Sequence, residues 1–199
     1  MISATYCTTL AQYNEWMNER LFALCAGLSD EELRRDRGAF FGSIQRTLNH
    51  ILYADLAFLS RFTGDPPAPP ELGVDLHTRF ADLHAARRAL DQRLCEWTAT
   101  LDDAWLRGTL TYVSKVDGRT RTRPRWLLVT HLFNHQAHHR GQTTTLLAQM
   151  GLDMGSTDLP FMPSFDDEGA GDPRVASTTS AGSAQVDDPV AHEPIRRCA

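Results

Sequence analysis

The sequence predicts an all-α protein, a four-helix bundle with a small β-hairpin before its last helix. Four long segments place apolar residues at intervals of three and four, which is the spacing of one face of an α-helix. A proline-rich segment, residues 64–75, separates the second of these from the third and is long enough to cross one end of a bundle. With 199 residues, 42% of them hydrophobic, the chain can form one domain with its own core.

The first helix is marked by an apolar stripe that runs from Leu10 to Leu28. Its one polar member is Asn14, for which a buried hydrogen-bonding role is favoured over a role facing a functional site. Ser29 followed by Glu32 matches a capping box and predicts a short extra turn after this helix.

The second helix is predicted to begin after Ser43, a suitable N-cap residue. His50 lies at the flank of its apolar face, next to small side chains that leave room beside it: Thr47, Ala54 and Ala57. Asp55 falls within the apolar face, where an unpaired carboxylate is costly. Arg87 interrupts the heptad-like seam of the third helix, residues 76–101, so we expect it to form an ion pair with Asp55.

A hairpin and the last helix complete the predicted fold. Asp117–Gly118 is a strong tight-turn dipeptide, and the residues around it predict a small hairpin over residues 109–122. Pro124 suits the first turn of a helix and Gly151 suits a C-cap, so the last helix is predicted between them.

The last helix holds four of the chain's eight histidines. His135 and His139 are four residues apart and therefore lie on one helical face, together with apolar residues at helical spacing: Leu128, Leu132, Leu146 and Met150. Buried imidazoles need either hydrogen-bond partners or a metal ion. From this pair alone, two interpretations remain: a metal site, or a pair of core histidines that are hydrogen-bonded.

A third imidazole is available on the second helix. Cores of helical bundles are where facing helices build metal sites, and His50 would complete a set of three with His135 and His139. Three protein ligands and an open position are typical of a catalytic metal site, and imidazoles suit zinc, nickel, copper or iron. His131 and His138 lie near the same face and are alternative ligands or supporting groups.

Other hydrolytic and metal motifs are absent from the sequence. A zincin helix needs HExxH, but the chain has Gln136 directly after His135, and no Glu-x-x-His pair of the carboxylate-bridged di-iron proteins occurs. The GxSxG sequence of a serine nucleophile is also missing.

Composition narrows the partners and the compartment. The net charge of -5 and the lack of a long basic run argue against nucleic acid as a partner. No apolar run approaches the roughly 18 residues that a membrane-spanning helix needs, and the N-terminus lacks a secretory signal. The four cysteines are too scattered to suggest a disulfide framework or a thiolate zinc site. We therefore expect a cytoplasmic protein.

The end of the chain differs in composition from the rest. Residues 166–199 contain no aromatic residue and are rich in Gly, Ser, Thr, Ala, Asp and Pro, a composition that buries too little surface to fold. We expect one domain over residues 1–165 and then a disordered tail, in which His192 and Cys198 have no specific role.

Several stretches, in this order, resemble the DinB (damage-inducible) family of the DinB/YfiT-like metalloprotein superfamily. They are Tyr13-Asn14-Glu15-Trp16, Gly42-Ser43-Ile44, Thr47-Leu48-Asn49-His50, Asp55, Arg61 and the run from His131 to Gln142. The resemblance covers roughly residues 5–165. It implies four helices in up-down-down-up order and a divalent metal on His50, His135 and His139. It also implies dimerisation and kinship with bacterial thiol-dependent transferases and isomerases.

Two functions are consistent with these features. The first is a metal-dependent enzyme, similar to a thiol S-transferase or isomerase, in which a bound thiol or water attacks an electrophilic small molecule with zinc or nickel as the metal. Asp55, Arg140 and Gln142 are candidates for supporting the ligands or orienting the substrate, and no catalytic base is assigned. The alternative is a non-catalytic metal-binding stress-response protein, whose site would be closed by a fourth ligand such as His138.

A second face of the last helix also predicts a contact. Opposite His135 this helix carries Trp126, Phe133, Ala137 and Thr144. Either the hairpin or the long crossover covers these residues, or they form an exposed contact surface. We expect the contact surface and a two-fold homodimer, the commonest closed assembly for a self-complementary patch.

Overall fold

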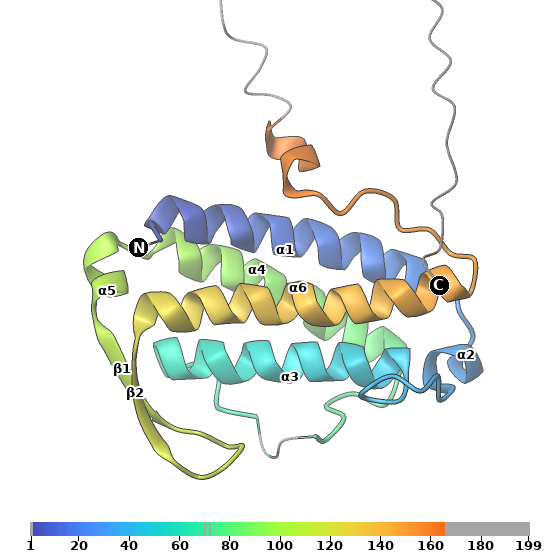
Figure 1. Cartoon of the computed structure of the whole chain (residues 1–199), viewed down its shortest axis with the longest axis horizontal. Coiled ribbons are helices and arrows are strands. Elements are labelled where there is room, and N and C mark those ends of the chain that lie inside the picture. Colours follow the sequence, from blue (N-terminus) through green and yellow to red (C-terminus); the bar gives the residue numbers. More distant parts are fainter. Residues whose placement is uncertain (1, 70, 72, 166–199) are drawn as a thin grey trace, which may run out of the picture. The chain divides into compact units, whose positions relative to one another are not determined.

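The computed structural model describes residues 2–69, 71 and 73–165, and these residues form six α-helices and one two-stranded antiparallel sheet. The long helices are α1 (Ala4–Cys25), α3 (Ile44–Thr63), α4 (Phe80–Ala99) and α6 (Arg125–Gln149). Helix α1 packs against α4 and α6, and α3 packs against the same two helices (Figure 1). The prediction of a mainly helical fold with one small hairpin is confirmed.

The ends of the helices follow from local capping chemistry. At the start of α3, the Ser43 hydroxyl accepts a hydrogen bond from the backbone N–H of Arg46 at 3.2 Å. Ser29 and Glu32 form the reciprocal capping box of α2 (Asp30–Arg34), as predicted. Gly151, with φ of 79°, adopts the left-handed conformation directly after the cap of α6, where other residues would be strained.

Between α4 and α6 lie one helix that the sequence analysis missed and the hairpin that it predicted. The short helix α5 (Asp103–Arg107) is capped by the Asp102 carboxylate, which accepts from the N–H of Trp105 at 2.6 Å. Strands β1 (Thr109–Val113) and β2 (Thr120–Pro124) then pair antiparallel. Two short 3-10 helices, η1 (Leu159–Phe161) and η2 (Pro163–Phe165), follow α6.

A cluster of three buried charged side chains joins α3 to α4. Arg87 is only 1% exposed and its guanidinium lies 2.5 Å from a carboxylate oxygen of Asp55 and 2.8 Å from one of Asp91. The Asn14 amide donates to Asp91 at 3.2 Å. The predicted Asp55–Arg87 ion pair and the buried hydrogen-bonding role of Asn14 are both confirmed.

The same network continues into α6. Gln136 donates a hydrogen bond to the Asp55 carboxylate, and Arg140 donates to Gln136 Oε1 at 3.0 Å. Arg140 also donates to Asn14 Oδ1, and Asn18 donates to Asp91 at 3.0 Å. Buried polar groups of α1, α3, α4 and α6 therefore form one hydrogen-bonded network in the middle of the fold, although Asp55 Oδ1 has no hydrogen-bond partner among the described residues.

The outer face of α6 corrects one prediction. Phe133 is only 5% exposed and belongs to the hydrophobic core, so it is not part of an exposed patch. The reason is that α6 packs against both α1 and α3, which makes its buried arc wider than a single stripe. Trp126 and Thr144 are half-buried, and Ala137 is exposed.

The chain divides into a unit of residues 1–162 and a second unit from residue 163, of which the structure describes only residues 163–165. The predicted tail, residues 166–199, lies outside the described residues. Over the described ranges, none of the helices combines the length and the apolar character that crossing a membrane requires. Cys7, Cys25 and Cys95 are free thiols.

Candidate metal centre

Three histidine rings meet where α3 packs against α6. His135 Nε2 lies 3.1 Å from His50 Nε2 and 3.1 Å from His139 Nε2. One ring nitrogen from each residue lies within 4.8 Å of the other two, a group that could hold a metal ion. The structure therefore brings together the three histidines that the sequence analysis selected.

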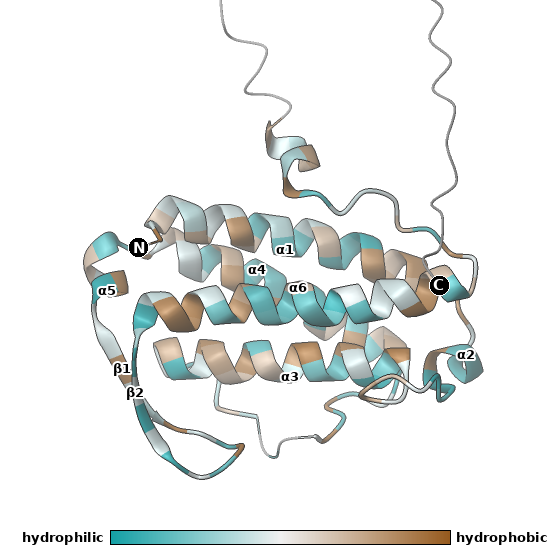
Figure 2. Ribbon diagram, in the orientation of Figure 1, coloured by the Kyte–Doolittle hydropathy of each residue, from teal (hydrophilic) through white to brown (hydrophobic). Residues whose placement is uncertain are grey.

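Helical periodicity explains how the rings converge. His135 and His139 are one turn apart on α6, and α3 lies along the same side and presents His50 to them. The middle of α6 is hydrophilic and has a hydrophobic stretch on either side, as Figure 2 shows. The imidazoles thus belong to a polar section inside a helix that is otherwise anchored by apolar residues.

The hydrogen bonds of His139 fix which of its nitrogens faces the other rings. Its Nδ1 lies 2.8 Å from Gln142 Oε1, an acceptor, so Nδ1 carries the proton and Nε2 presents a lone pair. The Gln142 amide in turn lies 3.2 Å from His138 Nε2 and donates to it. Gln142 therefore holds His139 in the tautomer that a metal ligand requires.

The spacing of the three rings fits an ion better than it fits hydrogen bonds alone. His135 Nε2 has two ring nitrogens at 3.1 Å, and one proton cannot form a full hydrogen bond to both. A tetrahedral ion with metal–nitrogen bonds of about 2.1 Å holds its ligand atoms roughly 3.4 Å apart, close to the two separations of 3.1 Å that involve His135. The donor set therefore fits a divalent transition ion.

Electrostatics keep the rings neutral near pH 7. Burial, with a smaller contribution from His139, lowers the pKa of His50 to about 4. Burial and the neighbouring imidazoles lower the pKa of His135 to about 3, and burial also lowers the pKa of His139. Neutral imidazole is the form that binds a metal, so the site is prepared for one without the loss of a proton.

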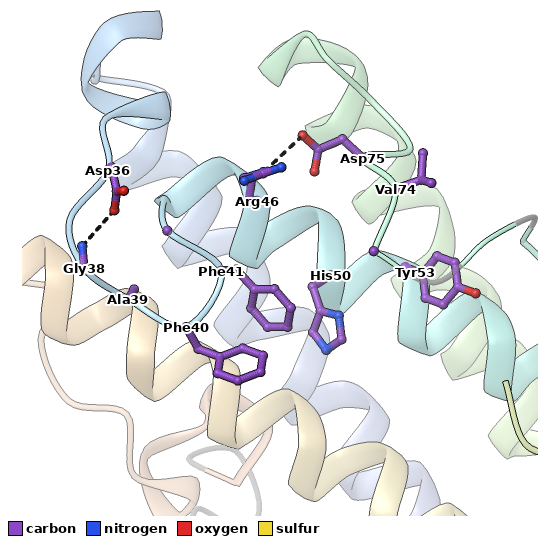
Figure 3. Close-up of a pocket in the computed structure, with 12 residues that line it drawn as sticks. Asp36, Gly38, Ala39, Phe40, Phe41, Arg46, His50, Tyr53, Val74 and Asp75 are labelled. Atoms are coloured by element: carbon purple, nitrogen blue, oxygen red, sulfur yellow. Dashed lines mark hydrogen bonds and ion pairs between the residues drawn. The ribbon is translucent and has the colours of Figure 1, made fainter. Parts of the chain in front are cut away.

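The loop before α3 supplies a residue that the sequence analysis did not assign to the site. The Phe41 ring stacks on His50 with centroids 4.0 Å apart and planes at 26°, and Figure 3 shows the two rings side by side. Phe41 also lies 5.4 Å from the His139 ring. It covers one side of the imidazole group and contributes to the burial of His50.

The two alternative histidines lie outside the group of three. The His131 ring is 5.6 Å from that of His135 and packs against Phe58, with centroids 5.1 Å apart. His138 is exposed and binds Gln142 through its Nε2. Within the described part of the chain, no fourth His, Cys, Asp or Glu joins the group.

The residues proposed to support the site divide into two sets. Gln142 contacts His139 directly, as expected. Asp55 and Arg140 instead make their hydrogen bonds within the buried network, and none of those described reaches the three histidines. They stabilise the packing of the helices that carry the site.

Two cavities reach the imidazole group. One of about 510 Å³ is lined by the loop at residues 36–42, by residues 73–75 and by α3, including His50 (Figure 3). The other, of about 240 Å³, lies between α3, α6 and the hairpin and is lined by His50, His131 and His135. Ala54 and Ala57 line this smaller cavity, so their small side chains do leave room beside His50, as predicted.

Comparison with known proteins finds a matching family, a related sequence and a similar fold. A sequence model of the DinB family matches residues 1–170. Protein DinB of Bacillus subtilis (strain 168) is 24% identical over 164 residues, which cover 75% of this chain and 88% of that protein. The crystal structure of a DinB-like protein from Bacillus cereus ATCC 10987 has a similar fold, with a TM-score of 0.53 and 23% identity over 71% of this chain and 90% of that one.

Proposed function

Because this chain belongs to the DinB family, we propose that it is a metal-dependent protein in which His50, His135 and His139 hold one divalent transition ion, zinc or nickel. The observation that supports the proposal most strongly is the convergence of the three ring nitrogens, with His135 Nε2 at 3.1 Å from each of the other two. Neutral imidazoles are suitable ligands for both metals.

We propose further that the protein is an enzyme of the thiol S-transferase or isomerase type. An ion at this site would lower the pKa of a bound thiol or water and fix its position. The chain itself contributes a cavity whose walls include the apolar side chains of Ala54, Ala57 and Phe58, which offer packing surface to the carbon atoms of a small-molecule substrate. Gln142 keeps His139 in the ligand tautomer throughout.

A set of three protein ligands among the described residues favours this function over non-catalytic metal binding. A purely structural site is usually closed by four protein ligands. His138, the residue considered for closure, is exposed and binds Gln142 instead. A small molecule could therefore approach the three imidazoles from the cavity.

The direct test is a conjugation assay on the intact, metal-loaded chain. Cysteine and 1-chloro-2,4-dinitrobenzene serve as generic thiol and electrophile, and the product is followed by absorbance. We expect a rate above the uncatalysed reaction that disappears with a chelator, returns when metal is added back and is lost in His135→Ala. A fully loaded chain that gives only the uncatalysed rate with this pair and with other small thiols and electrophiles would contradict the enzymatic proposal.

The finer architecture and the assembly are part of the same proposal. We infer that the four long helices form a bundle in up-down-down-up order. The directions of the helices in Figure 1 support this, since α1 and α6 run from left to right and α3 and α4 run from right to left. We also infer one domain over residues 1–165 and a homodimer. With Phe133 buried, we infer that the dimer contact includes the groove lined by Ile2, Tyr6 and Trp126.

A further inference from the structure

The smaller cavity beside the imidazole group has a cationic wall. Arg61, near the end of α3, places its guanidinium 4.9 Å from the centre of the Phe58 ring and 5.1 Å from that of Tyr112. The two rings hold the guanidinium at the cavity wall. No described residue forms a hydrogen bond or an ion pair with Arg61, so its N–H donors remain available to a ligand.

A second donor in the same cavity also lacks a partner. Tyr53 is 4% exposed, and its hydroxyl is buried without a hydrogen bond to any described residue. Buried hydroxyl groups are normally satisfied, so one without a partner in a cavity wall points to a ligand that supplies it. Tyr53 lies three residues after His50 and eight before Arg61, which places all three on one side of α3.

The charges around the cavity are of one sign. The side chains that line it include Arg61 and Lys115 but no aspartate or glutamate. The Lys115 ammonium donates to the backbone carbonyl of Pro69 and still contributes its charge. A negatively charged ligand is therefore favoured here over a neutral or cationic one.

We propose that this cavity binds the carboxylate of a small acidic substrate, with the Arg61 guanidinium and the Tyr53 hydroxyl as the hydrogen-bond donors. A planar carboxylate matches the two parallel N–H groups of a guanidinium. The rest of the substrate then extends along α3 toward His50 and His135. The volume of about 240 Å³ limits it to a small molecule.

The inference rests on the proposed function, because it adds a substrate class to the same site. Its first test uses two thiols that differ mainly in charge, 3-mercaptopropanoate and 2-mercaptoethanol, on the cobalt-loaded full-length chain. Cobalt–thiolate absorption reports binding. We expect the acid to bind at least roughly tenfold more tightly than the alcohol, since hydrogen bonds to charged groups are worth about that much or more.

Variants assign the preference to specific residues. Arg61→Met keeps much of the packing on Phe58 and Tyr112, and it should bring the affinities of the two thiols to within about twofold of each other. Arg61→Lys should retain part of the difference in affinity. Tyr53→Phe should lower the affinity for the acid several-fold. The matched control is Arg46→Met, which removes an exposed guanidinium from the other cavity and should leave the preference unchanged.

Separate arms distinguish this inference from the proposed function. Propanoate and propanol are titrated onto the metal-free chain by ligand-observed NMR, with inorganic phosphate as a second anion. If the parent chain bound no cobalt, the proposed function would fail. The inference would then be decided by whether the metal-free chain binds propanoate more tightly than propanol. Three outcomes would overturn the inference. The acid and the alcohol could bind equally well, or phosphate could bind where propanoate does not. The preference for the acid could also be lost in Arg46→Met and kept in Arg61→Met.

Discussion

At the residue scale, Gln142 is the side chain that prepares His139 to bind a metal. Its Oε1 accepts from His139 Nδ1 at 2.8 Å and so directs the lone pair of Nε2 toward the other rings. Loss of such a supporting group typically weakens metal affinity 10- to 100-fold. We expect about this loss for Gln142→Ala, measured by competition with a chromophoric chelator.

The matched control for this variant is Gln149→Ala, an exposed residue on the same helix. It should keep the parent affinity. Unchanged affinity in Gln142→Ala would show that the ring orientation of His139 is held by packing alone.

The lowered pKa values of the histidines predict how acid affects the metal-free chain. His135 and His50 have pKa values of about 3 and about 4 in the folded protein, against 6.5 for an ordinary histidine. Between those values the unfolded chain binds more protons than the folded one, so stability is present above pH 6.5 and is lost as the pH falls toward 4. Urea unfolding in the presence of a chelator should show this loss between pH 7 and pH 5.

Replacing His135 with a residue that does not titrate tests whether this histidine causes the loss of stability in acid. His135→Gln should lose less stability than the parent chain between the two pH values, while His138→Gln, at an exposed position on the same helix, should lose as much as the parent. The same loss in all three proteins would mean that other groups determine the acid sensitivity.

At the scale of the helices, Arg87 is the group that joins α3 to α4. It pairs with Asp55 at 2.5 Å and with Asp91 at 2.8 Å, and all three side chains are almost fully buried. Arg87→Met leaves two buried carboxylates without their cation and should cost about 3–5 kcal/mol in the free energy of unfolding, measured by urea denaturation.

The control for Arg87 is an arginine on the same helix whose ion pair is exposed. Arg93 pairs with Asp65 at 2.8 Å, with side chains 40% and 78% exposed, and Arg93→Met should change stability by less than about 1 kcal/mol. Similar costs for the two variants would contradict the structural role given to the buried network.

What the sequence predicts best at this scale is set by local chemistry. The helix starts after Ser29 and Ser43 are local capping patterns, and the four-residue step from His135 to His139 fixes their shared face in any helix. The Asp55–Arg87 pair was predictable as well, because a carboxylate on an apolar face needs a cation and the third helix offers one on its seam.

The features that the sequence did not reveal depend on contacts between distant segments. Phe41 covers His50 only because the loop before α3 folds back over the rings, and no local pattern encodes that path. Phe133 is buried rather than exposed, because its burial depends on how many helices contact α6. The role proposed for Tyr53 likewise depends on residues of the hairpin and of α3 lining one cavity.

At the scale of the whole molecule, the proposed homodimer can be tested by measuring the molecular mass in solution. Light scattering at micromolar concentration should give twice the 22.3 kDa of one chain. Tyr6 is 38% exposed and lines the open apolar groove at the start of α1 and α6, so Tyr6→Glu should dissociate the dimer while metal content stays unchanged. A parent mass near that of one chain would rule the dimer out.

The central claim is that three imidazoles from two helices hold one metal ion per chain. Elemental analysis after metal loading and dialysis tests it most directly, on the parent and on alanine variants of His50, His135 and His139. The parent should hold about one ion, and each variant should fall well below that. His131→Ala and His138→Ala should keep most of it, and His84→Ala, on α4 and away from the group, should keep all of it. Full occupancy in His135→Ala would contradict the account.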